Sequence, residues 1–174
     1  CALPISDSEE IPVSLEGNSD SFRMKLSFLP NGNCVILPNI NGRGYGFFKI
    51  TEGESSGLWS VLRSSEDEVL KGSLLITLYE NLRWKTISPQ GFREEMLAYL
   101  PNESNSLLFS MALSYLGDCQ RIFPSDSCPL EEALWKIVTT NPVSQHRLQA
   151  FRLYRSIADS EEAVQRLYTL WQER

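Results

Sequence analysis

The sequence of 174 residues contains one histidine, His146, and only four cysteines. A His-Glu-x-x-His zinc site needs two histidines, and a zinc knuckle needs a closely spaced cysteine pair of the Cys-x-x-Cys kind, which the chain lacks. The Gly-x-x-x-x-Gly-Lys loop that cradles phosphates is also absent. We therefore predict no catalytic, cofactor-binding or metal-binding residue in this chain.

Long apolar runs and an excess of positive charge are missing as well. No stretch approaches the roughly 18 apolar residues that cross a bilayer, so no transmembrane segment is predicted. The net charge of −6 disfavours nucleic acid as the main partner. Five of the acidic residues fall within residues 1–20, which hold no lysine or arginine. The hydrophobic share of 42% is ordinary for a globular protein, so a folded core is expected.

The N-terminal third predicts a short β element. Residues 1–20 carry proline, glycine and asparagine at positions that break long elements, and we interpret them as an irregular acidic lead. Within residues 21–50, positions 22–28 alternate apolar and polar side chains, which is the period of a strand. An Asn-Gly turn leads to a second expected strand at 34–37, and a third is expected at 45–50. The pattern predicts an antiparallel meander.

Residues 51–174 predict a helical-hairpin domain. Apolar residues recur there at helical spacing, and the run through residues 69–82 is apolar on nearly all sides, so a central helix is expected. A buried strand in part of that run stays open as an alternative. Short segments predict the helix ends: a Ser65–Glu68 capping box, Ser88 before Pro89, Asn102, Gly117 as a C-terminus, Asn141 before Pro142, and a second capping box at Asp159–Glu162.

Helix pairs are expected to open near residues 66, 103 and 142, a spacing of about 40 residues that is typical of HEAT-like hairpins. The three pairs do not match one another in sequence. The predicted fold class is α+β and predominantly α: a short antiparallel β element followed by a stack of helical hairpins, HEAT/ARM-like, in an α-α superhelix.

His146 and the cysteines are the candidates for a nucleophilic catalytic pair. We expect His146 at the edge of a core face with one satisfied nitrogen; a nucleophilic pair with Cys119 or Cys128 is the alternative. The two cysteines are interpreted as buried thiols, although a bridge between them would stabilise by about 2–3 kcal/mol. Cys1 suits either a processed lipoprotein start or an arbitrary boundary.

Three other groups of residues have a simple structural interpretation. The glycines Gly42, Gly44 and Gly46 are followed by an expected strand, which favours close packing or a bulge over a phosphate loop. The pairs Glu131-Glu132 and Glu161-Glu162 fall in first helical turns and offset the helix dipole. Four arginines are interpreted as a solvated face, with a basic patch for a peptide carboxylate as the alternative: Arg147, Arg152, Arg155 and Arg166.

Residues Leu37–Phe48, with Asn41-Gly42-Arg43-Gly44-Tyr45 at their centre, and residues 74–81 resemble part of the M1 family of zinc aminopeptidases. The similarity is to the region after the catalytic domain, where a β-sandwich ends in an Asn-x-x-Gly-Tyr strand and a C-terminal helical domain begins. Gly46-Phe47 after the tyrosine looks most like bacterial members, although the family usually has Tyr-Arg there.

The resemblance implies a non-catalytic C-terminal region that caps and shapes the peptide cavity of a parent metallopeptidase. Its partner would be the upstream catalytic domain of the parent chain, and possibly peptide. Zinc is expected in that missing domain and not in this chain, which lacks the family's His-Glu-x-x-His helix and Gly-x-Met-Glu-Asn loop. A stand-alone helical-repeat protein-binding module is the alternative function, and a small Cys/His hydrolase is a third.

Overall fold

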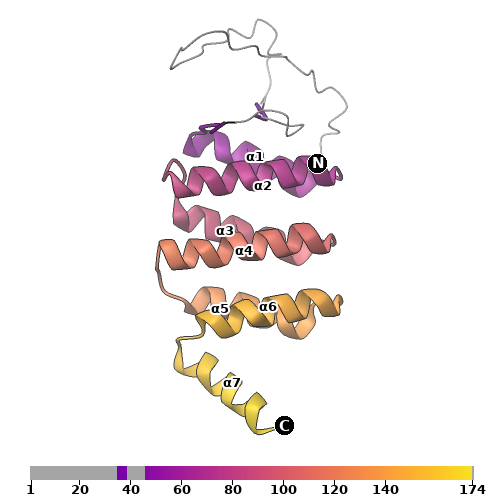
Figure 1. Cartoon of the computed structure of the whole chain (residues 1–174), viewed down its shortest axis with the longest axis vertical. Coiled ribbons are helices and arrows are strands. Elements are labelled where there is room, and N and C mark those ends of the chain that lie inside the picture. The colour runs from indigo at the N-terminus through magenta and orange to yellow at the C-terminus, as the bar shows by residue number, and fades with distance from the viewer. Residues whose placement is uncertain (1–34, 39–45, 174) are drawn as a thin grey trace, which may run out of the picture. The chain divides into compact units, whose positions relative to one another are not determined.

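The computed structural model describes residues 35–38 and 46–173, and these residues form seven α-helices and one short 3-10 helix (Figure 1). In chain order they are α1 (Glu52–Ser64), α2 (Glu68–Arg83), α3 (Pro89–Tyr99), η1 (Leu100–Asn102), α4 (Ser106–Ile122), α5 (Cys128–Thr140), α6 (Ser144–Ile157) and α7 (Glu161–Gln172). The predominantly helical class is therefore confirmed. All of the helices belong to one compact unit, Leu37–Arg174.

The predicted β element falls mostly outside the described residues, as do the acidic lead at 1–20, Cys1, Gly42 and Gly44. In the described part of residues 21–50, residues 35–37 and 46–50 form no strand, so the ends of the second and third expected strands are not confirmed. Gly46 has φ +154°, a backbone conformation that favours glycine, and no described atom lies within 4 Å of the place a Cβ would take. Within the described residues, conformation and not close packing accounts for this glycine.

The helices lie in layers, with α1 beside α2, α3 beside α4 and α5 beside α6, and the second helices of successive layers contact one another (Figure 1). The predicted pairing is therefore shifted by one helix. Residues 52–64 form a helix of their own, which the predicted pairs, the first opening near residue 66, did not include. A capping box between Thr51 and Glu54 starts this helix, with Thr51 N donating to Glu54 Oε2 over 2.7 Å.

Large apolar side chains from both helices of each layer fill the core. The first helices contribute residues spaced at i, i+4 and i+7, such as Phe92, Met96 and Tyr99 of α3. Helix α2 is apolar on several sides and buries Leu74, Leu78 and Leu82 among others, as its sequence predicts. The alternative of a strand in this run is wrong.

The helix caps agree with the sequence at one place and differ at others. Ser88 caps α3, with Pro89 at its first position. Asp67 and not Ser65 caps α2, accepting from the amides of Val69 and Leu70, because its carboxylate lies two residues closer to the apolar run. Gly117 is not a helix end; α4 continues to Ile122.

Two predicted asparagine caps are also displaced. Asn105, and not Asn102, accepts from the first amides of α4, because Pro101 closes a 3-10 turn that delays the helix. Asn141 ends α5, and its Oδ1 accepts from Val143 N over 2.9 Å, so α6 starts only at Ser144. Helix α7 is capped by Ser160, whose hydroxyl accepts from Ala163 N.

Buried polar side chains tie the layers together. The Glu103 carboxylate accepts from Lys71 Nζ of α2 over 2.9 Å, from the hydroxyl of Tyr99 in α3, and from Asn105 N over 2.7 Å. Burial alone raises the pKa of this carboxyl, but the hydrogen bonds outweigh that effect and its pKa lies below the ordinary value. One carboxylate thus joins α2, α3 and the start of α4.

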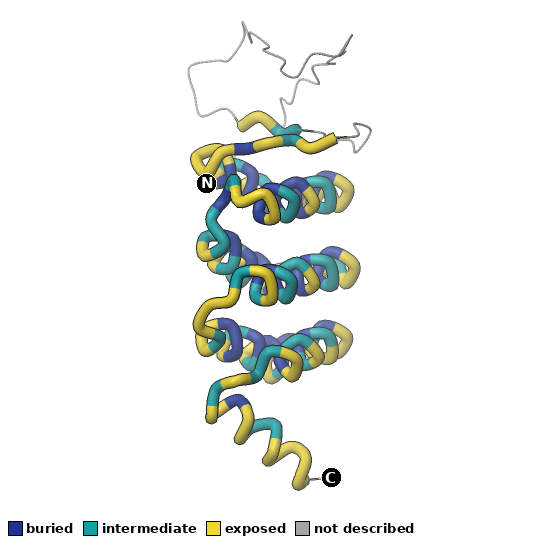
Figure 2. The backbone as a smooth tube through the Cα atoms, turned by 60° about the vertical axis from the view of Figure 1, so that its left-hand side comes forward, coloured by how far each residue is buried: buried dark blue, intermediate teal, exposed yellow. Residues whose placement is uncertain are grey.

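Residues 46–50 lie over the first layer (Figure 2), and a side-chain amide holds them there. Asn81 of α2 is fully buried; its Nδ2 donates to Phe48 O over 2.8 Å and its Oδ1 accepts from Ile50 N over 2.9 Å. The same Oδ1 accepts from the Thr86 hydroxyl over 2.6 Å. Asn81 therefore binds a non-helical backbone segment on both its donor and its acceptor sides.

Candidate functional site

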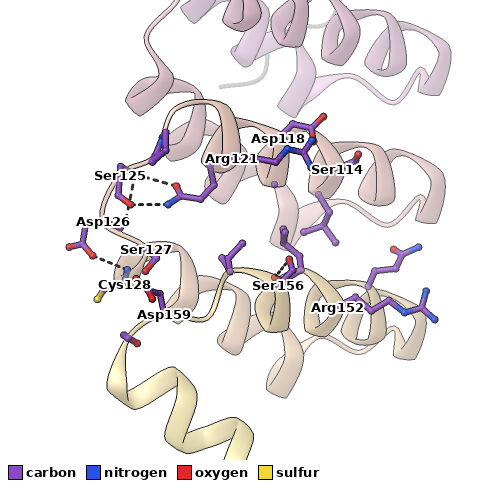
Figure 3. Close-up of a pocket in the computed structure, with 18 of the residues that line it drawn as sticks. Ser114, Asp118, Arg121, Ser125, Asp126, Ser127, Cys128, Arg152, Ser156 and Asp159 are labelled. Carbon is purple, nitrogen blue, oxygen red and sulfur yellow. Dashed lines mark hydrogen bonds and ion pairs between the residues drawn. The ribbon is translucent and has the colours of Figure 1, made fainter.

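A groove between α4 and α6 is open to solvent and has a volume of about 920 Å³ (Figure 3). The α5 side is closed by the α4–α5 loop, in which Gln120 Nε2 donates to Ser125 O over 2.8 Å and Cys128 N donates to Asp126 over 3.0 Å. The groove therefore has two helical walls and one ordered loop at its end.

Small side chains open the groove. Ser110, Ser114 and Gly117 line the α4 wall, and Ser156 lies on the α6 wall. At Gly117 the two helices approach so closely that an added Cβ would lie 2.8 Å from Cδ1 of Leu153. Glycine permits that approach, and the serines beside it leave room for a ligand.

One rim of the groove is held by an aromatic stack. The rings of Tyr79 and Tyr115 lie parallel, 4.0 Å apart, and the Tyr79 hydroxyl donates to Asp118 Oδ2 over 2.7 Å. Burial, and then the bond to Asp118, raises the pKa of Tyr79 to about 12. Arg121 binds the other oxygen of Asp118. The Asp118 carboxylate is thus already occupied.

The opposite wall carries unoccupied polar groups. The side-chain oxygen of Gln149 is buried and has no hydrogen-bond partner among the described residues. Arg152, one turn further along α6, is exposed and forms no ion pair within that part of the chain. A buried carbonyl without a donor is unfavourable by about 1–3 kcal/mol, so turning the Gln149 side chain to meet a ligand N–H in the groove would relieve that cost. No sequence pattern predicted a role for Gln149.

His146 lies outside the groove and is fully buried, not at the core edge. Its ring stacks on Phe109 at 3.9 Å, and Nε2 lies 3.1 Å from the hydroxyl of Ser106. Nδ1 has no partner among the described residues, so the prediction of one satisfied nitrogen is confirmed. An activated serine also needs a group that orients the histidine through this second nitrogen, and none is present in the described structure.

Cys119 and Cys128, the cysteines in the described part of the chain, do not pair with His146 or with each other. Cys119 is buried, with Sγ near Pro89 O and Arg93, and burial raises the pKa of its thiol. Cys128 is exposed at the start of α5, so the prediction of two buried thiols is wrong for this residue. Its bond to Asp126 raises the pKa of its thiol, which disfavours the reactive thiolate. The nucleophilic pairing with His146 is therefore wrong.

The charged residues of the last helices divide into separate roles. Glu131, Glu161 and Glu162 lie in first turns, as predicted, whereas Glu132 falls beyond the first turn of α5. Arg166 binds Glu132 over 2.7 Å and Glu162 over 2.5 Å, which removes it from the expected face of arginines. Arg147 donates to Asn141 O, and Arg147, Arg152 and Arg155 are all exposed, as the interpretation of a solvated face expects.

The described residues form neither a metal-binding cluster nor a helix that could span a membrane. No group of three or more histidine, cysteine, aspartate or glutamate side chains among them is arranged to hold a metal ion, so they do not fit zinc. None of the described helices has both the length and the apolar character needed to cross a membrane.

Comparison with protein-family models gives no match, and no curated protein or solved structure matches the chain either. The similarity to the M1 aminopeptidase region thus stays a prediction from residues 37–48 and 74–81. Part of its motif, residues 39–45, lies outside the described residues.

Proposed function

We propose that this chain is a non-catalytic helical-hairpin domain that binds an extended polypeptide segment in the groove between α4 and α6. The observation that carries the proposal is the buried side-chain oxygen of Gln149, which has no hydrogen-bond partner among the described residues and lines the groove beside Arg152. A ligand backbone offers N–H donors to Gln149, and a ligand carboxylate suits the planar donors of Arg152.

The molecule contains its own example of this kind of binding. The Asn81 side chain accepts a hydrogen bond from the backbone N–H of Ile50 and donates one to the backbone carbonyl of Phe48. Gln149 has the same chemical group, and like Asn81 it lies on the second helix of a layer. The Gln149 amide can therefore hydrogen-bond the backbone of a bound peptide in the groove, as the Asn81 amide hydrogen-bonds the backbone of residues 48–50.

We further propose that the domain belongs to an M1-like zinc metallopeptidase, as the non-catalytic region after the catalytic domain. What supports this is the order of the chain: the Asn41–Tyr45 motif, then a non-helical segment held on α2, then helical hairpins. The peptide in the groove would then be part of a substrate or of the parent chain, and the zinc chemistry would belong to the catalytic domain. The stand-alone binding module remains the alternative.

Peptide binding is tested by selecting a random peptide library on the purified chain and measuring affinities by fluorescence anisotropy. Arg152→Ala and Gln149→Ala should each lower the affinity for the selected peptides about tenfold or more, which is a change of about 1.4 kcal/mol in the free energy of binding. Arg155→Ala is the matched control, since Arg155 is an exposed arginine of α6 that does not line the groove. Selection of no peptide, or equal losses for Arg152→Ala and Arg155→Ala, would contradict the groove assignment.

The parent protein is tested separately by sequencing the gene around this segment. An upstream His-Glu-x-x-His helix in the same reading frame supports the peptidase. A frame that encodes no such helix favours the stand-alone module and leaves the peptide measurement unaffected.

A further inference from the structure

Helix α7 contacts the third layer with one face. Its capping residue Ser160 binds Glu131 of α5, Arg166 bridges to Glu132 over 2.7 Å, and the Arg166 guanidinium lies 5.4 Å from the ring of Trp135. Ala163 is buried and Leu167 packs against the core. These contacts turn one face of α7 toward α5.

Each first helix of a layer carries the same pattern. Three residues spaced at i, i+4 and i+7 are buried in α1 (Ser55, Trp59, Leu62), α3 (Phe92, Met96, Tyr99) and α5 (Leu130, Leu134, Ile137). In α1 and α3 the first of them is four residues after the N-cap, and in α5 it is three residues after it. In all three layers a second helix, α2, α4 or α6, packs against the first.

Helix α7 repeats this pattern without being covered. Val164, four residues after the N-cap Ser160, starts a set with Tyr168 and Trp171. These three side chains, the α7 stripe, are 52%, 49% and 69% exposed. The rings of Tyr168 and Trp171 contact each other at 5.9 Å. The stripe therefore has the spacing of a hairpin interface and the exposure of a docking surface.

The charges of α7 indicate what the surface would accept. The exposed charged residues of α7 and its C-cap in the described structure are Glu161, Glu162 and Glu173. Arg166 pairs with Glu162 and with Glu132 of α5, which leaves Glu161 and Glu173 without an ion pair among the described residues. A second copy of the chain would bring glutamates toward glutamates, which is unfavourable.

We propose that the α7 stripe docks an amphipathic α-helix of a partner protein, with an apolar i, i+4, i+7 stripe and lysine or arginine on its flanks. The partner helix takes the place beside α7 that α2, α4 and α6 take beside α1, α3 and α5, and its basic side chains face the glutamates of α7. Such a helix-in-groove interface uses the same packing as the layers themselves.

The test uses the whole chain and two synthetic helical peptides, both with a leucine stripe, one flanked by lysines and the other by glutamates. Anisotropy should report binding of the lysine peptide, with affinity about tenfold lower for the glutamate peptide. Trp171→Ala should lower the affinity for the lysine peptide about tenfold or more. Trp84→Ala is the matched control, because Trp84 is 71% exposed but lies at the end of α2, away from the stripe.

Other outcomes would overturn the proposal. Equal binding of the two peptides would remove its electrostatic basis, and no binding of either would remove the docking site. Dimerisation that Trp171→Ala abolishes would assign the stripe to a second copy. A longer gene product whose own later helix covers the stripe would replace the partner protein. Arg152→Ala should leave helix binding unchanged, so this proposal and the groove proposal fail separately.

Discussion

Glu131 of α5 binds the N-terminus of α7 through Ser160: its Oε1 accepts from Ser160 N over 3.2 Å, and its Oε2 accepts from the Ser160 hydroxyl. Asp159 N donates to the same Oε1 over 2.8 Å. The first layer has a related contact, because Glu52 of α1 accepts from Ser88 N, at the cap of α3, over 2.6 Å. In both places a glutamate of one first helix fixes where the next first helix begins.

Replacing Glu131 by alanine should lower the free energy of unfolding by about 2 kcal/mol, because two amides and a hydroxyl lose a charged acceptor. Urea denaturation measures the loss, and faster amide exchange at Ala163 would place it at α7. Glu132→Gln is the control: Glu132 is largely exposed, and its ion pair should be worth less than about 1 kcal/mol. Equal losses in both variants would contradict the capping role.

Acid should weaken the same contact. Burial raises the pKa of Glu131, but hydrogen bonds from Ser160 and Asp159 outweigh it, so the folded-state pKa lies below the ordinary value. The stabilisation is therefore complete above the ordinary carboxyl pKa and is lost as the pH falls through the folded value. Urea midpoints between neutral and acidic pH should show a smaller decrease in Glu131→Gln than in the unmodified chain. Parallel pH curves would exclude this residue as a source of acid sensitivity.

His146 should add a second pH dependence at higher pH. Burial lowers its pKa, and the nearby Glu103 carboxylate offsets this only in part. The unfolded chain takes up a proton near pH 6.5, whereas the folded chain resists it, so stability should decrease as the pH falls below that value. His146→Phe, which keeps a flat ring on Phe109, should remove this decrease. His146→Ala should instead cost about 2–4 kcal/mol at neutral pH through the cavity it leaves.

Local sequence patterns predicted some features and missed others for physical reasons. Ser88-Pro89 indicates a helix start by itself, since the serine can cap the helix and the proline has no amide that needs a partner. The structure confirms this start of α3. Ser65, Asn102 and Asn141 are equally good caps in isolation. Asp67 and Asn105 act as the caps in place of Ser65 and Asn102, and α6 starts at Ser144, three residues after Asn141. Tertiary packing, and not the capping residue, decides which turn of a helix is the first.

The candidate site was harder to predict than the fold. The groove depends on Gly117 facing Leu153 and on Gln149 lacking a donor, and both are relations between residues far apart in the sequence. The prediction that no residue of this chain is catalytic rested on missing motifs and stays a prediction. Ser106, the neighbour of His146, gave no signal because it is 40 residues away.

Asn81 should be needed to hold residues 46–50 on α2. In Asn81→Leu the buried amide of Ile50 would lose its acceptor, which should cost about 1–3 kcal/mol. Limited proteolysis should then cut near Lys49 faster than in the unmodified chain. In Asn81→Asp the acceptor is kept and the donor to Phe48 O is lost, so cleavage should be intermediate. Unchanged proteolysis in Asn81→Leu would show that Ile50 packing alone holds the segment.

Replacing two glycines of second helices by alanine should change the stability of the protein differently. At Gly72 an added Cβ would lie 3.7 Å from Leu108, an ordinary contact, so Gly72→Ala should stabilise by about 0.5–1 kcal/mol through helix propensity. At Gly117 the Cβ would lie 2.8 Å from Leu153, so Leu153 must move into the groove and the gain should be reduced or reversed. In a Leu153→Ala background Gly117→Ala should regain the stabilisation seen at Gly72. A double-mutant cycle in urea measures this coupling, and additive effects would mean that α4 and α6 do not approach one another at Gly117 in solution.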